Sequence, residues 1–293
     1  MTGTLEYIKL ARFDTVRGYG GHAPLLKRDT KTVLLTYNPD IVFTVGNTAT
    51  SVAQEMLASL GRTTPIVMVA TLKPAQDNIV PHDPDAAGTI CSGNNVTGFS
   101  VPVSTYHERL ALVISCIQRP ITRILLLHSS TKDLGVKDEI DSLTGALQAL
   151  DIEVVDHIFD DDNRIHLEQL AHHGFDMILL PRDGLVMDYI HDIIKLSRAS
   201  KIPLLTSDGL SARLGATMSF GVSEHLIGEK AALWGRQVVA EKRDPSVVTM
   251  KMVMETEWGE REHLTYNRAA AAKQGILFNY EKLTSYQIPI ELI

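Results

Sequence analysis

Short runs of apolar, mostly β-branched residues recur along this chain, and each is followed by a loop and then by an amphipathic stretch. Ile41–Val45 is the first clear run, and Thr50–Leu60 after it places Val52, Met56 and Leu60 at helical spacing. Further strands are predicted at Ile66–Ala70, Ile124–Leu127, Ile152–Val155, Met177–Leu180, Ile202–Leu205 and Ala216–Val222. Strands that are apolar on both faces and alternate with helices predict an α/β protein whose parallel sheets are covered on both sides.

Length and charge narrow the class of protein. The chain has 293 residues, 44% of them hydrophobic and 22% charged, so it can form two lobes that each bury a core. The formal net charge is −7, and no stretch combines clustered Lys and Arg with aromatics, which disfavours a nucleic-acid partner. No apolar run reaches the roughly 18 residues that a spanning helix needs, so we expect no direct membrane insertion by this chain.

The sequence offers no pattern for a metal or a cofactor. Cys91 and Cys116 fit no metal or redox spacing and are predicted to be free thiols, with a single disulfide as the alternative. The acidic run at Asp160–Asp162 lacks the alternating ligands of a calcium loop and is interpreted as a solvated helix start. We therefore expect no metal ion and no cofactor.

Six motifs occur in an order that is more specific than the general α/β pattern. They are Pro39–Val42, Gly46–Ala49, Thr64–Ala70, Asn95–Ser100, Lys201–Asp208 and Tyr266–Ile276. In this order the chain resembles the substrate-binding proteins of ABC transporters that are associated with tryptophan and tyrosine uptake. The resemblance implies the type I periplasmic binding fold, in which two Rossmann-like lobes with parallel sheets are joined by a three-stranded hinge.

The resemblance also implies how the chain is divided. Lobe 1 is expected to contain residues 1–99 and 221–245, and lobe 2 residues 100–220 and 246–293. Crossings between the lobes are predicted near Asn94–Ser104, Ser219–Gly221 and Asp244–Val247, the last around Pro245. Members of the family have an additional β-α unit at the start of lobe 1, which we expect to be missing from this chain.

The loop after the first predicted strand is the leading candidate for binding a carboxylate. Gly46, Asn47, Thr48 and Thr50 stand at the carboxyl end of a strand and the start of a helix, where backbone N–H groups and hydroxyls can hold an anion. The alternative is that the same residues only cap the helix, and the two roles are compatible. Ala70 and Thr71 end the next strand at the same edge, with an ordinary loop start as the alternative.

Candidate residues of lobe 2 also follow predicted strands. Ser129 and Ser130 come after the first strand of that lobe and could face the ligand, or could form a helix cap or turn. Asp208 follows Leu204–Thr206 and is the preferred partner for a ligand ammonium group. Asp183 is a second candidate, although its Pro-Arg-Asp-Gly context also predicts a plain turn.

Together these features predict a solute-binding protein of an ABC importer, with a membrane permease as partner and no enzymatic activity. The ligand is expected to be a small molecule, an amino acid, and the resemblance implies an aromatic one. The alternatives are a ligand-sensing domain with the same fold and a two-lobed enzyme of amino-acid metabolism. A two-base racemase would need thiols at two facing strand ends, which Cys91 and Cys116 do not supply.

The expected location follows from the resemblance as well. The family is exported, which implies a periplasmic or extracytoplasmic protein. Met1–Arg17 contains no apolar core of a signal peptide, so a cytoplasmic or truncated chain is the alternative expectation.

Overall fold

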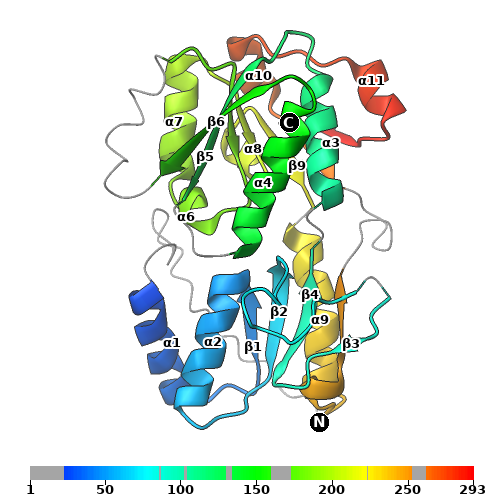
Figure 1. Ribbon diagram of the computed structural model, residues 1–293. Helices are drawn as coiled ribbons and strands as arrows, with labels where there is room; N and C mark the ends of the chain where they lie inside the picture. The colour runs from blue at the N-terminus through cyan, green and yellow to red at the C-terminus, as the bar shows by residue number, and fades with distance from the viewer. Residues whose placement is uncertain are drawn as a thin grey trace.

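The computed structural model describes residues 23–85, 87–101, 104–129, 134–159, 173–222, 224–252 and 262–293. These residues form two lobes, each built on one sheet with helices on both faces, and Figure 1 shows lobe 1 below lobe 2. The predicted α/β class with two mostly parallel sheets is confirmed. The predicted loss of a first β-α unit concerns the start of the chain, where residues 1–22 lie outside the described part.

Lobe 1 is organised around a five-stranded sheet in the order β1-β2-β4-β10-β3. β1, β2, β4 and β10 are parallel, and only the short β3 runs antiparallel, against β10. The strands are β1 (Val42–Val45), β2 (Ile66–Thr71), β3 (Ile90–Cys91), β4 (Val96–Ser100) and β10 (Thr249–Met252). The helices are α1 (Ala23–Tyr37), α2 (Asn47–Ser59), α9 (Glu224–Val239) and the 3₁₀ helix η2 (Pro245–Val247).

The sequence of strand β2 is apolar because both of its faces are buried. Ile66 and Met68 point toward α2 and belong to one core, while Val67 and Val69 pack with Trp234 of α9 in another. Because both faces of β2 are buried, no polar alternation remains in its sequence. Gly98 of β4 lies beside this strand with φ +122°, and a Cβ there would lie 2.1 Å from a backbone oxygen of β2.

Lobe 2 contains a seven-stranded sheet in the order β12-β11-β9-β8-β7-β5-β6. The central strands are parallel, and β11 pairs antiparallel with β9. The strands are β5 (Arg123–Ser129), β6 (Glu153–Phe159), β7 (Met177–Leu180), β8 (Leu204–Thr206), β9 (Met218–Gly221), β11 (His263–Tyr266) and β12 (Ile290–Leu292). The helices are α3 (Ser104–Ser115), α4 (Leu134–Gln148), α6 (Gly184–Met187), α7 (Ile190–Ser200), α8 (Ser211–Leu214), α10 (Arg268–Gln274) and α11 (Tyr280–Ser285).

The chain crosses between the lobes after β4, after β9 and after β10, as the order of the elements in the two sheets requires (Figure 1). The first two crossings lie where the sequence predicts them. The third was predicted near Asp244–Val247, and this prediction is wrong. That segment is η2, and the chain continues from it into β10, which pairs with β4 of lobe 1.

This difference also moves the predicted boundary of the lobes. Residues 246–293 were assigned to lobe 2, but Thr249–Met252 are part of the lobe 1 sheet. Pro245 opens a short 3₁₀ helix within the lobe rather than a linker, because Pro at a first helical position loses no hydrogen bond there. The described chain leaves lobe 1 at Met252 and continues at Glu262 in lobe 2.

The carboxyl ends of the parallel strands of both lobes face one another. β4 passes directly from its carboxyl end into lobe 2, where α3 begins and runs away from lobe 1 before the chain turns back in β5. β5 therefore points its carboxyl end toward lobe 1, and the strands parallel to it do the same. Ligands of open α/β sheets bind at this edge, so the space between the lobes is where the candidate residues must be sought.

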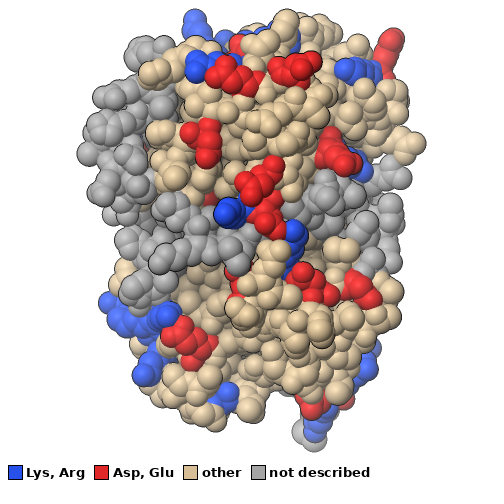
Figure 2. All heavy atoms as spheres, viewed as in Figure 1, with Lys and Arg blue, Asp and Glu red and all other residues tan. Residues whose placement is uncertain are grey.

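The surface carries both signs of charge. Figure 2 shows acidic and basic side chains interspersed over this face, with basic side chains gathered over α1, whose sequence contributes Lys27, Arg28 and Lys31. Within the described residues, no helix combines the length and the hydropathy required to cross a membrane.

Candidate functional site

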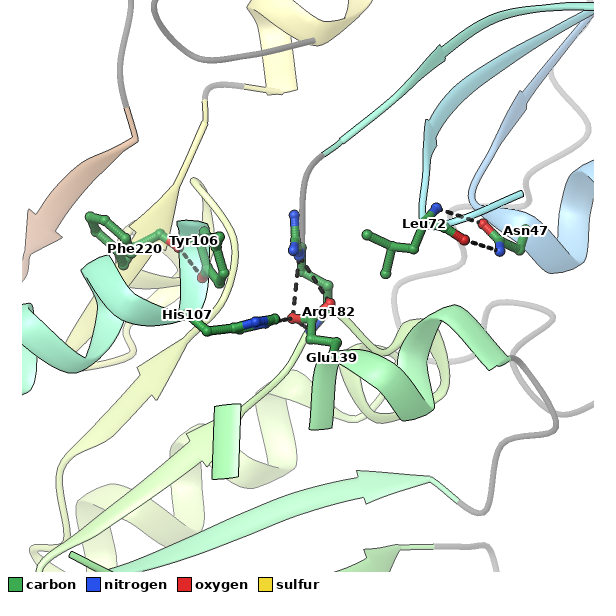
Figure 3. A network of polar contacts seen from close by, with 7 residues as sticks. All are labelled: Asn47, Leu72, Tyr106, His107, Glu139, Arg182 and Phe220. Atoms are coloured by element: carbon green, nitrogen blue, oxygen red, sulfur yellow. Dashed lines mark hydrogen bonds and ion pairs between the residues drawn. The ribbon is translucent and has the colours of Figure 1, made fainter. Parts of the chain in front are cut away.

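Asn47 of lobe 1 is held by bonds inside its own lobe. Its Oδ1 accepts a hydrogen bond from the backbone N–H of Leu72 at 2.8 Å, and its Nδ2 donates to the Leu72 carbonyl at 2.6 Å (Figure 3). Nδ2 also donates to Asp77. These bonds fix the loop after β2 in place, so the Asn47 side chain positions that loop.

The other candidate residues for binding a carboxylate, Gly46, Thr48 and Thr50, lie between β1 and the first turn of α2. Gly46 has φ +80° and precedes α2, and no side chain caps this helix. The Thr50 hydroxyl is buried and donates to the Gly46 carbonyl at 2.7 Å. Thr48 is exposed at the first turn of α2. The role of Thr48 in binding a carboxylate stays a prediction.

At the end of β2, Ala70 has φ +52°, which is an unusual conformation for a residue with a Cβ. Thr71 is fully buried, and its hydroxyl donates to the Phe99 carbonyl of β4 at 3.4 Å. Thr71 therefore joins two strands of lobe 1. The two residues lie at the predicted edge of the sheet.

In lobe 2, two predicted residues contact each other. The Ser129 backbone N–H and the Ser129 hydroxyl both donate to Asp183 Oδ2, each at 2.7 Å, and both side chains are buried. These bonds tie the end of β5 to the end of β7 at the carboxyl edge. Ser130 lies outside the described residues.

Asp208 has one carboxylate oxygen that is engaged and one that is not. Oδ1 accepts hydrogen bonds from the backbone N–H groups of Leu210 and Ser211, both at 2.6 Å, which starts the short helix α8. Oδ2 is buried and accepts no hydrogen bond from any described residue. Gly221 packs directly on this residue, since a Cβ there would lie 2.6 Å from the Asp208 carbonyl carbon.

Buried hydroxyls surround the same strand ends. Thr206 is the last residue of β8 and is paired in register with Ser219 of β9. The hydroxyl oxygens of Thr206, Ser211 and Ser219 are buried without a hydrogen-bond partner among the described residues. A buried polar group without a partner is costly, so this end of the sheet is suited to a polar ligand.

A cluster centred on Arg182 was not predicted from the sequence. Arg182 follows β7, and its Nε lies 3.1 Å from Glu139 Oε2 and 3.2 Å from Oε1. Its backbone N–H also donates to Glu139 Oε1 at 3.1 Å. The guanidinium carbon lies 4.4 Å from the centre of the Tyr106 ring, and Figure 3 shows the side chain between Tyr106 and Leu72 of lobe 1.

Burial and charge set the protonation of this cluster. Burial is the largest influence on the pKa of Glu139 and acts to raise it, but the charge of Arg182 and the contacts with His107 together outweigh burial, so the pKa is lowered. Burial is the largest influence on the pKa of Arg182 and acts to lower it, but the charges of Glu139, Tyr106 and Glu262 together outweigh burial, so the pKa is raised. Both groups are therefore ionised at neutral pH. Burial also raises the pKa of Tyr106 well above its ordinary value, so its hydroxyl stays protonated.

Leu72 and Lys73 connect lobe 1 to lobe 2 directly. Leu72 is 5% exposed and packs into the core of lobe 2 with Tyr106, Val136 and Ile140. Lys73 forms an ion pair with Asp138 of α4, and Gln76 Nε2 donates to the same carboxylate at 3.2 Å. The loop after β2 therefore packs against lobe 2.

Of the two residues that were not predicted, Glu139 left a signal in the sequence and Arg182 did not. Glu139 occupies the same helical face as Val136, Ile140 and Leu143, and a carboxylate on an apolar face predicts a buried partner. Arg182 was hidden inside the turn interpretation of Pro-Arg-Asp-Gly, which explained Asp183 and left the arginine without a role.

The described residues contain no group of three or more His, Cys, Asp or Glu side chains arranged to hold a metal ion. Cys91 is exposed, Cys116 is buried, and both are free thiols. A separate depression of about 440 Å³ lies at the amino ends of β1 and β2, the opposite edge from the candidate residues. It is lined by Asn38, Pro39, Asp40, Gly61, Arg62, Thr63, Thr64 and Pro65.

Comparison of this sequence with known protein families identifies the family to which the chain belongs. The family described as ABC transporter substrate binding protein matches residues 26–287, which is most of the chain. The chain belongs to this family. As a substrate-binding protein it is a member of a family of solute-binding proteins, not of enzymes.

Solved structures support the fold of this substrate-binding protein. An ABC domain from Streptococcus pneumonia in complex with L-Trp has a TM-score of 0.74 at 18% identity, covering 93% of this chain and 87% of that one. A conserved domain protein from Vibrio cholerae has a TM-score of 0.72 at 18% identity, covering 93% and 84%. The ligand-free, open structure of a substrate binding protein with adhesive properties from Clostridium difficile has a TM-score of 0.56 at 16% identity, covering 92% and 83%. A search of curated protein sequences found no match.

Proposed function

We propose that this substrate-binding protein captures an aromatic amino acid between its two lobes and delivers it to the permease of an ABC importer. Capture requires closure of the lobes and no chemical step. The membrane permease is the proposed partner, and an extracytoplasmic location is proposed with it. The family match and the fold support the general role, and the ligand class is the part that the candidate residues must support.

The observation that carries the proposal is the Oδ2 atom of Asp208, which is buried and has no hydrogen-bond partner within the described part of the chain. A buried carboxylate oxygen without a hydrogen-bond donor is strongly unfavourable, and a ligand ammonium group would supply both the donor and the opposite charge. The oxygen lies at the carboxyl edge of the parallel strands, where open α/β sheets bind ligands. The structure of a similar fold in complex with L-Trp supports the choice of an aromatic amino acid.

The proposal is tested by thermal unfolding of the protein with each of the common amino acids. A ligand at about 100 times its Kd adds roughly 2.7 kcal/mol of stability, which corresponds to a rise in Tm of about 4 °C for a chain of this size. We expect such a rise with tryptophan or tyrosine, and we expect the ligand to be recovered unchanged. If no amino acid raises Tm, or if the bound compound is converted, the proposal is refuted.

A matched pair of variants localises the effect. Asp208→Asn keeps an oxygen for the helix-capping bonds and removes the negative charge. Asp244→Asn is the control, because Asp244 also accepts a backbone hydrogen bond at a helix start, from Ser246 at 2.9 Å, but lies in lobe 1 near β10. The first substitution should abolish the rise in Tm, and the second should leave it intact.

A further inference from the structure

We infer that Arg182 binds the carboxylate of the ligand, so that lobe 2 alone recognises both charges of the amino acid, with Asp208 holding the ammonium group. This inference rests on the proposed function and adds to it a residue and a ligand class. It also differs from the role given above to Thr48, because it moves the carboxylate from the α2 loop of lobe 1 to the β7 end of lobe 2.

The orientation of Arg182 is fixed before any ligand arrives. The Glu139 carboxylate contacts its Nε edge through both oxygens, and the Tyr106 ring packs against the face of the guanidinium at 4.4 Å. A guanidinium presents five donors in a rigid fork, which matches the geometry of a carboxylate. With its Nε edge and one face held, little conformational entropy is lost when an anion binds to the side chain.

The end of the side chain lies where a ligand between the lobes would meet it. The Arg182 side chain is 23% exposed, whereas Glu139 is fully buried behind it. Figure 3 shows the Arg182 side chain between Tyr106 of lobe 2 and Leu72 of lobe 1.

Tyr106 brings the two receptor groups close to each other. Its ring contacts Arg182, and its hydroxyl donates to the Phe220 carbonyl at 2.7 Å. The next residue, Gly221, packs against Asp208. The guanidinium of Arg182 and the main chain of Asp208 are therefore linked through Tyr106 and the end of β9. A small molecule that carries both charges on neighbouring atoms is the ligand expected to contact the two side chains.

The charge balance of the cluster selects the class of ligand. Glu139 already offsets Arg182, and Glu262 lies 3.6 Å from Arg109. Asp208 adds a negative charge whose Oδ2 has no partner among the described residues. An acid without an amine would bring a second uncompensated negative charge, whereas an α-amino acid brings one charge of each sign. The geometry thus favours zwitterions over simple aromatic acids.

The experiment uses two sets of three compounds with isothermal titration calorimetry. The tryptophan set is L-tryptophan, tryptamine and indole-3-propionate, and the tyrosine set is L-tyrosine, tyramine and 3-(4-hydroxyphenyl)propionate. The variant Glu139→Gln/Arg182→Gln removes both charges of the buried pair, so that no buried charge is left alone. Its control is Glu153→Gln/Arg123→Gln, which removes an exposed pair with the same Nε–oxygen distance of 3.1 Å.

We expect the wild-type protein to bind one amino acid more tightly than its amine or its acid. In the Glu139→Gln/Arg182→Gln variant the Kd of the amino acid should rise about 10- to 100-fold while that of the amine stays unchanged. In the Asp208→Asn variant the Kd of the amino acid should rise by a similar factor, while the Kd of the acid should stay unchanged. The exposed-pair control should match the wild type for all compounds.

The outcomes separate the two proposals. If the wild type binds none of the compounds, both the proposed function and the inference fail. If the wild type binds an amino acid, but the Glu139→Gln/Arg182→Gln variant weakens binding of the amine as much as binding of the amino acid, the inference alone fails. The same holds if Thr48→Val, rather than the Arg182 variant, selectively weakens compounds that carry a carboxylate. Circular dichroism of each variant before titration shows that it is folded.

Discussion

The substitution Glu139→Gln tests whether the cluster of Arg182 is as tightly coupled as its geometry indicates. Glu139 is fully buried, and both of its oxygens lie within 3.2 Å of Arg182 Nε. The neutral amide is nearly the same size as the carboxylate, so the substitution leaves the packing intact. What changes is that a largely buried guanidinium loses its counter-charge.

Two independent estimates give the size of the effect. Breaking a buried ion pair by removing one partner costs about 3–5 kcal/mol, because the remaining charge is uncompensated. Coulomb's law for charges about 4 Å apart gives a similar value, about 4 kcal/mol, at an effective dielectric constant of 20. We therefore expect Glu139→Gln to lower the free energy of unfolding by about 3–5 kcal/mol.

The assay is equilibrium unfolding in urea, and the chain contains its own control. Arg123 and Glu153 form an ion pair with the same 3.1 Å distance, but their side chains are 36% and 60% exposed. Glu153→Gln should change stability by less than about 1 kcal/mol, since exposed pairs contribute little. Equal effects of the two substitutions would refute the reasoning. So would a Glu139→Gln/Arg182→Gln variant that is as unstable as the sum of its single substitutions.

Three further predictions concern the contact between the lobes and the fold of lobe 1. Leu72→Ala removes a side chain that packs into the core of lobe 2, so it should lower the free energy of unfolding by about 2–4 kcal/mol. It should also increase the radius of gyration measured by X-ray scattering. An unchanged radius of gyration would contradict the role of Leu72. A hydrogen bond from Lys73 lowers the pKa of Asp138. The stabilisation of the contact between the lobes by this pair is therefore fully present above pH 3.8, the ordinary pKa of an aspartate, and is lost as the pH falls through the lowered pKa. The radius should therefore rise in acid, and less so in Asp138→Asn. Gly98→Ala places a Cβ 2.1 Å from a backbone oxygen and should cost about 3 kcal/mol or more in urea unfolding, whereas Gly228→Ala, with nothing within 4 Å, should not destabilise.

The elements that the sequence predicted well are those whose burial is uniform. The runs at Ile66–Ala70 and Met177–Leu180 are buried on both faces, so their apolar character alone indicates parallel strands, and both are observed. The third crossing was misplaced because a proline at the start of a 3₁₀ helix and a proline in a linker have the same local signal. Which sheet β10 joins depends on its pairing with β4, a contact across 150 residues that local patterns do not contain.

The candidate residues show the same limit. Strand ends place Asp208 and Asp183 at the correct edge, because every parallel strand carries its loop there. Whether such a carboxylate is already satisfied is decided by neighbours distant in the chain: Asp183 is bonded to Ser129, and Asp208 keeps one oxygen without a partner. Arg182 depends in the same way on Glu139, which no spacing in the sequence connects to it.

Hydrogen exchange with and without the tightest-binding amino acid tests the central claim most directly, because the chain offers two rival places for a ligand. If the ligand binds between the lobes, it should slow exchange in the loop after β2 and at residues 181–183 and 206–211, on the facing carboxyl edges. The depression at the amino ends of β1 and β2, lined by residues 38–40 and 61–65, should be unaffected. Protection of that depression, with no change at the carboxyl edges, would contradict the account.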